Sequence, residues 1–121
     1  MKKIILFSLS FALLFVAQAQ TGKKHVEAYF SYTNFFSPVD GPYVETYLSV
    51  YGKSVKFVET EKGKFEAKVE VTSIFSKDGK IMAFDKINLH SPVISDTTKR
   101  DIFFHDQQRI GIPNGKYEFQ M

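Results

Sequence analysis

Apolar and charged residues alternate strictly between residues 64 and 71. This alternation constrains the fold of the chain more than any other feature of the sequence. Every second side chain is apolar and every side chain between is charged, so that Phe65, Ala67, Val69 and Val71 alternate with Lys64, Glu66, Lys68 and Glu70. Successive side chains of a β-strand point to opposite faces. The pattern therefore predicts a strand with one face in a core and the other in water, which is typical of antiparallel sheets.

The chain beyond residue 19 repeats the signs of strands. Tyr, Phe, Val, Ile and Thr are abundant, and Gly41, Gly52 and Gly63 separate short runs at a constant interval of 11 residues. Regular spacing of this kind favours an all-β fold, and specifically an immunoglobulin-like antiparallel β-sandwich. We predict strands near residues 25–32, 43–51, 54–60, 64–76, 80–90, 101–105 and 116–121.

Residues 42–51 also fit a short helix. Pro42 suits the first position of a helix, and Gly52 suits the position just past its end. The β-branched and aromatic residues between them prefer an extended backbone, so a strand is the favoured interpretation.

The turn Asp78-Gly79 joins two predicted strands into a hairpin, and the length of this turn sets which residues face each other. A two-residue turn places Val69 opposite Asn88. A three-residue turn with a left-handed Gly79 places Val69 opposite Ile87 and keeps the apolar face continuous. We expect the second register, although it puts Asp85 opposite Val71.

The segment Pro113-Asn114-Gly115 predicts a tight turn, and Tyr117 opens a new alternating strand two residues later. This placement fits the tyrosine corner of sandwich domains, in which the phenol hydrogen-bonds to the chain just upstream. In that fold another strand follows, whereas this sequence stops at Met121. We therefore expect a domain that lacks its last strand and has a free edge. The alternative is that Tyr117 is an ordinary strand aromatic and the domain closes differently.

The first 19 residues have the three parts of a secretory signal peptide. Lys2-Lys3 precede the apolar run Ile4–Val16, and Ala17-Gln18-Ala19 forms the cleavage site. The apolar run has 13 residues, fewer than the roughly 20 of a membrane-spanning helix. We predict a helical signal peptide over 1–19 and one exported domain over 20–121, periplasmic or extracellular and free of the membrane after cleavage.

Removing the signal peptide changes the charge of the chain. The whole chain has 16 basic and 13 acidic residues and a formal charge of +3; without Lys2 and Lys3, 14 basic and 13 acidic residues leave +1. This balance gives no basis for expecting a nucleic-acid partner. The sequence also has no cysteine, so the stability of the exported part must come from packing rather than from disulfides.

No catalytic or metal-binding pattern stands out in the sequence. His25, His90 and His105 lie too far apart for one helix or hairpin to bring together. Ser91 stands beside His90 and near Asp96, but it lacks the nucleophile-elbow pattern of a hydrolase. We predict no enzymatic activity, no cofactor and no metal site.

One row of residues is a candidate binding surface. If residues 43–51 form a strand, Tyr43, Tyr47 and Tyr51 share one face with Glu45 and Ser49. Aligned phenol rings suit a glycan or a peptide partner, because they bury area and keep a polar tip. The alternative is that these rings pack under the neighbouring loop at residues 35–38, or against a part of the protein beyond residue 121.

Several short segments carry a family resemblance. They are Phe35-Phe36-Ser37-Pro38, Asp40-Gly41-Pro42-Tyr43-Val44-Glu45, Val69-Glu70-Val71, and Arg109-Ile110 leading to Pro113-Asn114-Gly115-Lys116-Tyr117. Through them residues 25–121 resemble the amino-terminal region of the GWxTD-domain proteins, which are exported bacterial proteins. The Gly-Trp-x-Thr-Asp motif itself is absent, since the chain has no Trp. The resemblance implies export and architecture, and it transfers no catalytic residue.

These observations predict a non-catalytic interaction or structural module of an exported envelope protein. Its expected partner is a downstream domain of the same protein or another envelope protein. Two alternatives stay open: an accessory domain of an exported enzyme whose catalytic part lies beyond residue 121, and a glycan-binding module that uses the tyrosine row.

Overall fold

The structure, a computed structural model, describes residues 25–121, and the predicted signal peptide over 1–19 lies outside them. The described part is nearly all β and antiparallel, as the sequence predicted. In chain order its elements are β1 (Ala28–Ser37), β2 (Gly41–Tyr51), the 3-10 turn η1 (Gly52–Ser54), β3 (Phe57–Glu61), β4 (Lys64–Lys77), β5 (Lys80–His90), β6 (Phe103–Gly111) and β7 (Glu118–Gln120).

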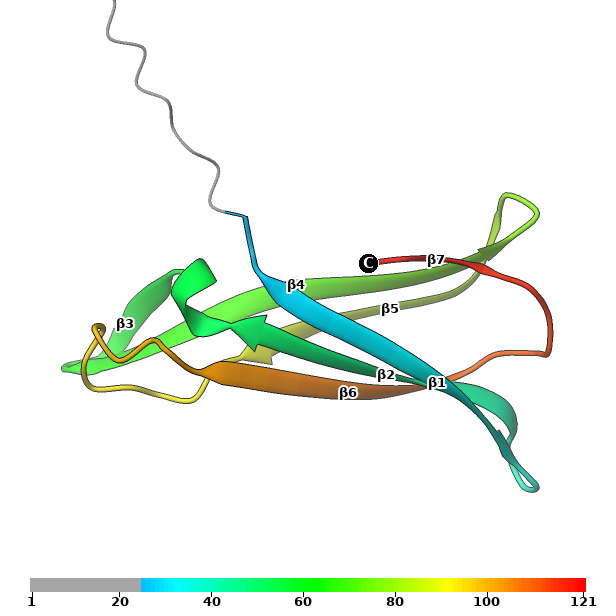
Figure 1. Cartoon of the computed structure of the whole chain (residues 1–121), viewed down its shortest axis with the longest axis horizontal. Coiled ribbons are helices and arrows are strands. Elements are labelled where there is room, and N and C mark those ends of the chain that lie inside the picture. The colour runs from blue at the N-terminus through cyan, green and yellow to red at the C-terminus, as the bar shows by residue number, and fades with distance from the viewer. Residues whose placement is uncertain (1–24) are drawn as a thin grey trace, which may run out of the picture.

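The strands form two sheets that lie one over the other in Figure 1. The first sheet has the order β1-β2-β6. In the second sheet β4 pairs with β5 along one side, while β3 and β7 pair with different stretches of β4. Strand β3 pairs with the beginning of β4, at residues 64–67, and β7 pairs with its end, at residues 74–76.

Two buried clusters join the sheets. The larger one contains Leu48, Val50 and Phe104 from the first sheet and Ala67, Val71 and Leu89 from the second, together with Val55 and Phe57. The smaller one contains Val44, Phe75 and Ile112, with Tyr117 and Phe119 packed against it. Since each cluster draws on both sheets, burial of apolar side chains between the sheets holds them together.

The register of the β4–β5 hairpin differs from both registers predicted from the sequence. The turn is the two-residue type, because Asp78 and Gly79 both have positive φ angles of 51° and 74°, as a type I′ turn requires. A bulge between Phe75 and Ser76 then shifts the register by one residue. As a result Val69 faces Leu89 rather than Asn88 or Ile87.

The bulge keeps the apolar face continuous, which was the reason for favouring the other register. Val71 faces Ile87, and Asp85 faces the small polar Ser73 instead of an apolar residue. The misfit that the predicted register created at Asp85 is thereby removed.

Several predicted boundaries were also wrong. Residues 42–51 form a strand, as favoured, but β1 covers residues 28–37 rather than 25–32, and β6 covers 103–111 rather than 101–105. Both extensions pair with β2, which supplies backbone partners along its whole length. Residues 35–37, interpreted as a loop, are therefore the end of β1, and the turn follows them at Ser37–Asp40.

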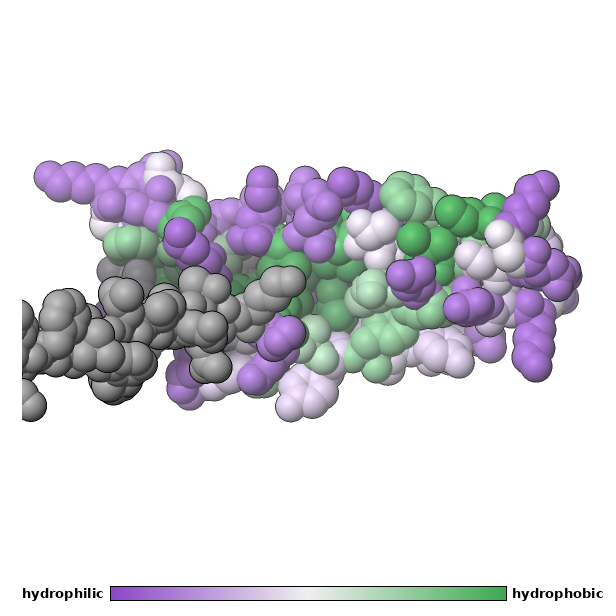
Figure 2. Space-filling view, turned by 90° about the horizontal axis from the view of Figure 1, so that it is seen from above, coloured by the Kyte–Doolittle hydropathy of each residue, from purple (hydrophilic) through white to green (hydrophobic). Residues whose placement is uncertain are grey.

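The outer face of the second sheet carries mixed side chains. Figure 2 looks onto this face and shows apolar side chains gathered toward one end. On this sheet Ile81, Met82 and Phe84 of β5 are each about half exposed. Toward the other end of the same sheet the outward side chains are the lysines and glutamates that the alternating pattern predicted to face water.

Candidate functional site

The predicted tyrosine row lies on the outer face of the first sheet. Strand β2 buries Val44, Leu48 and Val50 between the sheets, and its alternate residues therefore point outward. Tyr43, Tyr47 and Tyr51 are all on this outer face and all half-buried. We call the outer face of β1, β2 and β6 the tyrosine face.

Glu45 is the polar centre of the tyrosine face. It accepts hydrogen bonds from the Tyr47 hydroxyl, from Arg109 at 3.0 Å and from Gln107 at 3.3 Å, and its side chain is only 11% exposed. The Tyr47 hydrogen bond, followed by that from Arg109, lowers the pKa of Glu45 below its usual 4.5. The same bond raises the pKa of Tyr47. The Arg109 guanidinium also lies 4.5 Å from the ring centre of Tyr43, a cation–π contact.

Tyr51 has its partners at the other end of the face. Its hydroxyl donates a hydrogen bond to Asp101 at 3.0 Å, and Lys53 donates another to Asp101 at 2.7 Å. The Lys53 hydrogen bond, with a smaller contribution from Tyr51, lowers the pKa of Asp101. The ring of Tyr51 stacks on Phe103 at 5.0 Å, and Tyr29 lies 6.0 Å from the same Phe103 ring.

The three predicted tyrosines are thus tied to side chains of their own sheet. Phe35 stacks on Tyr43 at 5.4 Å, which agrees with the alternative that the row packs against residues 35–38. The aromatic surface that remains most open on this face belongs to Tyr29, 70% exposed, and Phe103, 46% exposed. Neither residue belongs to the row predicted from the sequence, because both join it only through strand pairing with β2.

The residue types that suggested hydrolase or metal chemistry do not converge. Ser91 accepts a hydrogen bond from the backbone N–H of Ala67 and donates one to the Pro92 carbonyl, so its hydroxyl serves the backbone. His90 contacts Glu66, and Asp96 accepts hydrogen bonds from residue 98. Within residues 25–121, no group of three or more His, Cys, Asp or Glu side chains is placed to hold a metal ion.

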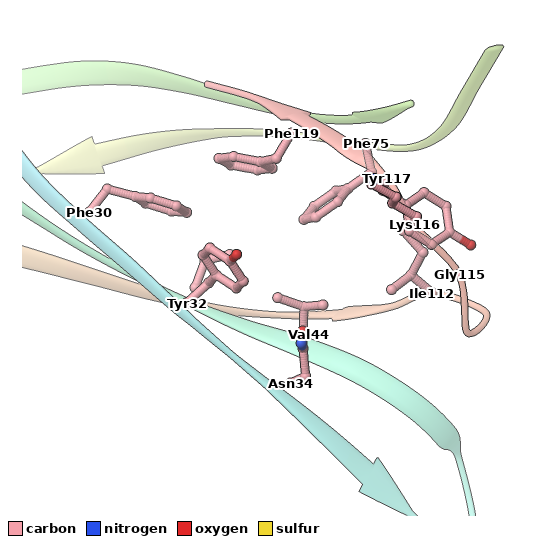
Figure 3. A pocket seen from close by; sticks show the side chains of 11 residues that line it. Phe30, Tyr32, Asn34, Val44, Phe75, Ile112, Gly115, Lys116, Tyr117 and Phe119 are labelled. Carbon is pink, nitrogen blue, oxygen red and sulfur yellow. The ribbon is translucent and has the colours of Figure 1, made fainter. Parts of the chain in front are cut away.

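A second surface emerges where the inner face of β1 is left uncovered. Phe30, Tyr32 and Phe36 all point to the side of β1 that faces the second sheet, yet they are 37%, 62% and 69% exposed. Between β1 and β7 lies a groove with a volume of about 390 Å³. Figure 3 shows its lining residues, which are Phe30, Tyr32, Asn34, Val44, Thr46, Phe75, Ile112, Gly115, Lys116, Tyr117 and Phe119. We call this space the open groove.

The lining of the open groove is mainly aromatic and aliphatic. Phe119 stacks on Phe30 at 4.9 Å and contacts Phe75 at 4.8 Å, so one ring of β7 bridges the two sheets. Two lysines stand at the end near Tyr117: Lys116 lines the groove, and the Lys77 ammonium lies 5.9 Å from the Tyr117 ring centre.

The Tyr117 side chain holds the segment that forms this end of the groove. Its hydroxyl donates a hydrogen bond to the carbonyl oxygen of Pro113 at 2.7 Å, four residues upstream. This is the bond that a tyrosine corner makes. It fixes the crossing from β6 to β7, and therefore where Phe119 enters the core.

Both strands that border the open groove are edge strands within the described residues. Strand β1 pairs only with β2, and β7 pairs only with β4, over three residues. The backbone groups on the other side of each strand have no strand partner there. Such edges are the places where another strand adds to a sheet.

The chain was compared with protein-family models, curated proteins and solved structures. No protein-family model, no curated protein and no solved structure matches the chain. Among residues 25–121 the structure contains no helix of the length and apolarity needed to cross a membrane.

Proposed function

We propose that this chain is a non-catalytic interaction module of an exported protein, with the open groove as the surface that meets its partner. The observation that carries the proposal is the exposure of Phe30 and Tyr32, neighbouring rings on the inner face of β1 that line the open groove. Contiguous exposed apolar side chains of this kind mark interaction sites in soluble proteins. The partner is a downstream domain of the same protein or another envelope protein.

The proposed fold is an immunoglobulin-like β-sandwich without its last strand. Its support is the β1-β2-β6 sheet facing a sheet centred on β4, and the Tyr117 hydrogen bond at the entry to β7. In immunoglobulin-like domains the strand after the tyrosine corner lies between two neighbours. Here β7 has one neighbour, β4, and the vacant side borders the open groove.

Export, to the periplasm or the exterior, is proposed from the sequence of residues 1–19 and from the resemblance to the amino-terminal region of GWxTD-domain proteins. The module would then act outside the cytoplasm, with another envelope protein or its own downstream domain as the partner.

Site-specific photo-crosslinking tests the interaction. A photo-reactive amino acid replaces Tyr32 in the full chain, and in a matched variant it replaces Glu59, which is exposed on β3. Expressed in the cells that make the protein, the Tyr32 variant should form a discrete adduct that the Glu59 variant does not form. Identical adducts from both variants, or none from Tyr32, would remove the open groove as an interaction surface.

The tyrosine face supports a second candidate function, glycan binding. The favouring observation is that Tyr29, Tyr51 and Phe103 form one aromatic cluster beside Ser49 and His105, whose side chains lie 2.6 Å apart. Sugar rings stack on such aromatics while hydroxyl groups bond to polar neighbours. The test is binding of cell-wall glycans to the chain with Tyr51→Ala. Unchanged binding together with a lowered melting temperature would assign the row a packing role alone.

A further inference from the structure

We propose that the open groove accepts an extended strand from a separate partner polypeptide, which pairs with the free edge of β7 and buries alternate apolar side chains against β1. The proposal rests on the interaction function above and specifies its mode of binding. It follows from three features of the groove: its backbone edge, its apolar lining and the charge at one end.

The backbone edge favours strand addition. Strand β7 is three residues long and is hydrogen-bonded to β4 on one side only. An added strand would satisfy backbone groups on the open side of β7, and main-chain hydrogen bonds of this kind supply much of the affinity in β-strand addition. A globular ligand without an extended backbone would leave these groups to water.

The lining specifies which side chains the strand must carry. Phe30 and Phe119 form one wall with their stacked rings, and Val44 and Ile112 lie deeper. A strand beside β7 would point every second side chain into this space and the others to solvent. The partner should therefore be apolar at alternate positions. The volume of about 390 Å³ lies within the roughly 300–1,000 Å³ range of ligand sites.

The charge at one end specifies the flank of the strand. Lys116 lines the groove and Lys77 lies against the Tyr117 ring, and neither forms an ion pair with another of the described residues 25–121. A carboxylate at the end of the bound strand would meet both ammonium groups. The occupant is thus an extended segment with alternating apolar residues and an acidic flank.

Synthetic peptides test the proposal directly on the full chain. The probe is a peptide of about nine residues in which Val and Thr alternate, with Glu at both ends so that either strand direction brings a carboxylate to the lysines. One control peptide has the same composition with its Val residues in a single block. A second control carries N-methyl groups on alternate peptide nitrogens, which removes the donors that pair with β7.

Binding is measured by isothermal titration calorimetry, and amide hydrogen exchange is measured over residues 117–121. We expect the alternating peptide to bind, both controls to bind at least about tenfold more weakly, and exchange over residues 117–121 to slow only with the alternating peptide.

Matched variants locate the site. Tyr32→Lys introduces a charge on the groove side of β1, while Ser31→Lys introduces the same charge on the opposite side of the same strand. Lys116→Glu reverses a charge in the groove, and Lys62→Glu makes the same change in the remote β3–β4 turn. The two groove variants should weaken binding at least about tenfold, and the two controls by less than about twofold. Circular dichroism checks that each variant is folded.

Three results would overturn the proposal. Equal binding of the N-methylated and unmethylated peptides would show contact without strand pairing. Crosslinking at Tyr32 with no binding of any peptide would exclude a strand ligand. In both cases the interaction function above would stand. A dimer of the chain alone, detected by light scattering and lost in Tyr32→Lys, would assign the groove to a second copy.

Discussion

The Tyr117→Phe variant tests whether the hydrogen bond at the entry to β7 stabilises the fold. The substitution removes the hydroxyl that donates to the Pro113 carbonyl at 2.7 Å. It keeps the ring that packs against the Val44 cluster and lies beside the Lys77 ammonium. The measured change in unfolding free energy therefore reports the hydrogen bond and little else.

The expected magnitude follows from the place of this bond. An intramolecular hydrogen bond contributes about 0.5–1.5 kcal/mol net, and this one lies near the surface, so we expect a loss of about 0.5–1 kcal/mol. For a domain of this size that loss corresponds to a melting temperature lower by about 2–8 °C. Tyr117→Ala also removes the half-buried ring. The loss of the ring should add about half of the 3–5 kcal/mol that removing a fully buried aromatic side chain costs.

Urea unfolding followed by circular dichroism measures the effect, since the chain has no Trp for fluorescence. With a slope of about 1–3 kcal/mol per molar urea, the midpoint of Tyr117→Phe should fall by about 0.2–1 M. Tyr32→Phe is the control, because that side chain is 62% exposed on an edge strand. Equal midpoints for Tyr117→Phe and Tyr32→Phe would refute a stabilising tyrosine corner.

Three further predictions concern packing and charge. Gly52→Ala should destabilise the fold by about 1–3 kcal/mol in thermal melts, because the new Cβ would lie 2.6 Å from a main-chain oxygen. Gly111→Ala is the control and should be nearly neutral, because open space surrounds that position. Leu48→Ala should cost about 2–5 kcal/mol in urea unfolding, whereas Val58→Ala, 48% exposed, should cost under about 1 kcal/mol. Hydrogen bonding lowers the pKa of Glu45 in the folded protein. The ionised carboxylate therefore stabilises the fold above pH 4.5, and this stabilisation is lost as the pH falls through the lowered pKa. The melting temperature of Glu45→Gln should accordingly fall less steeply with acid than that of the parent chain. A parallel acid profile would contradict this.

The strand content of this protein follows from its sequence, because it depends on local pattern. The alternation over residues 64–71 predicted both the strand and its buried face, and Ala67 and Val71 are indeed buried. Gly41, Gly63 and Gly79 all have positive φ angles in turns, where their lack of a Cβ makes that conformation inexpensive. These features involve residues close in the chain, so a single sequence records them.

Strand register escaped prediction because a bulge leaves no clear local mark. The bulge places one extra residue, Met82 of β5, opposite the step from Phe75 to Ser76, and it shifts every pair farther from the turn by one residue. Its benefit, a continuous apolar face with Asp85 opposite Ser73, exists only once both strands and the facing sheet are in place.

The sequence alone therefore determined an antiparallel β protein with an alternating buried face, turns at specific glycines, and a row of tyrosines on one side of a strand. Only the tertiary structure decided what those residues do. It tied the tyrosine row to Glu45, Arg109 and Asp101 through strand pairing. It also brought Phe30 of β1 against Phe119 of β7, at opposite ends of the described chain, and left the groove between them open. The physical reason is that long-range packing decides which residues become neighbours across strands and sheets, and a short segment of sequence does not contain that information.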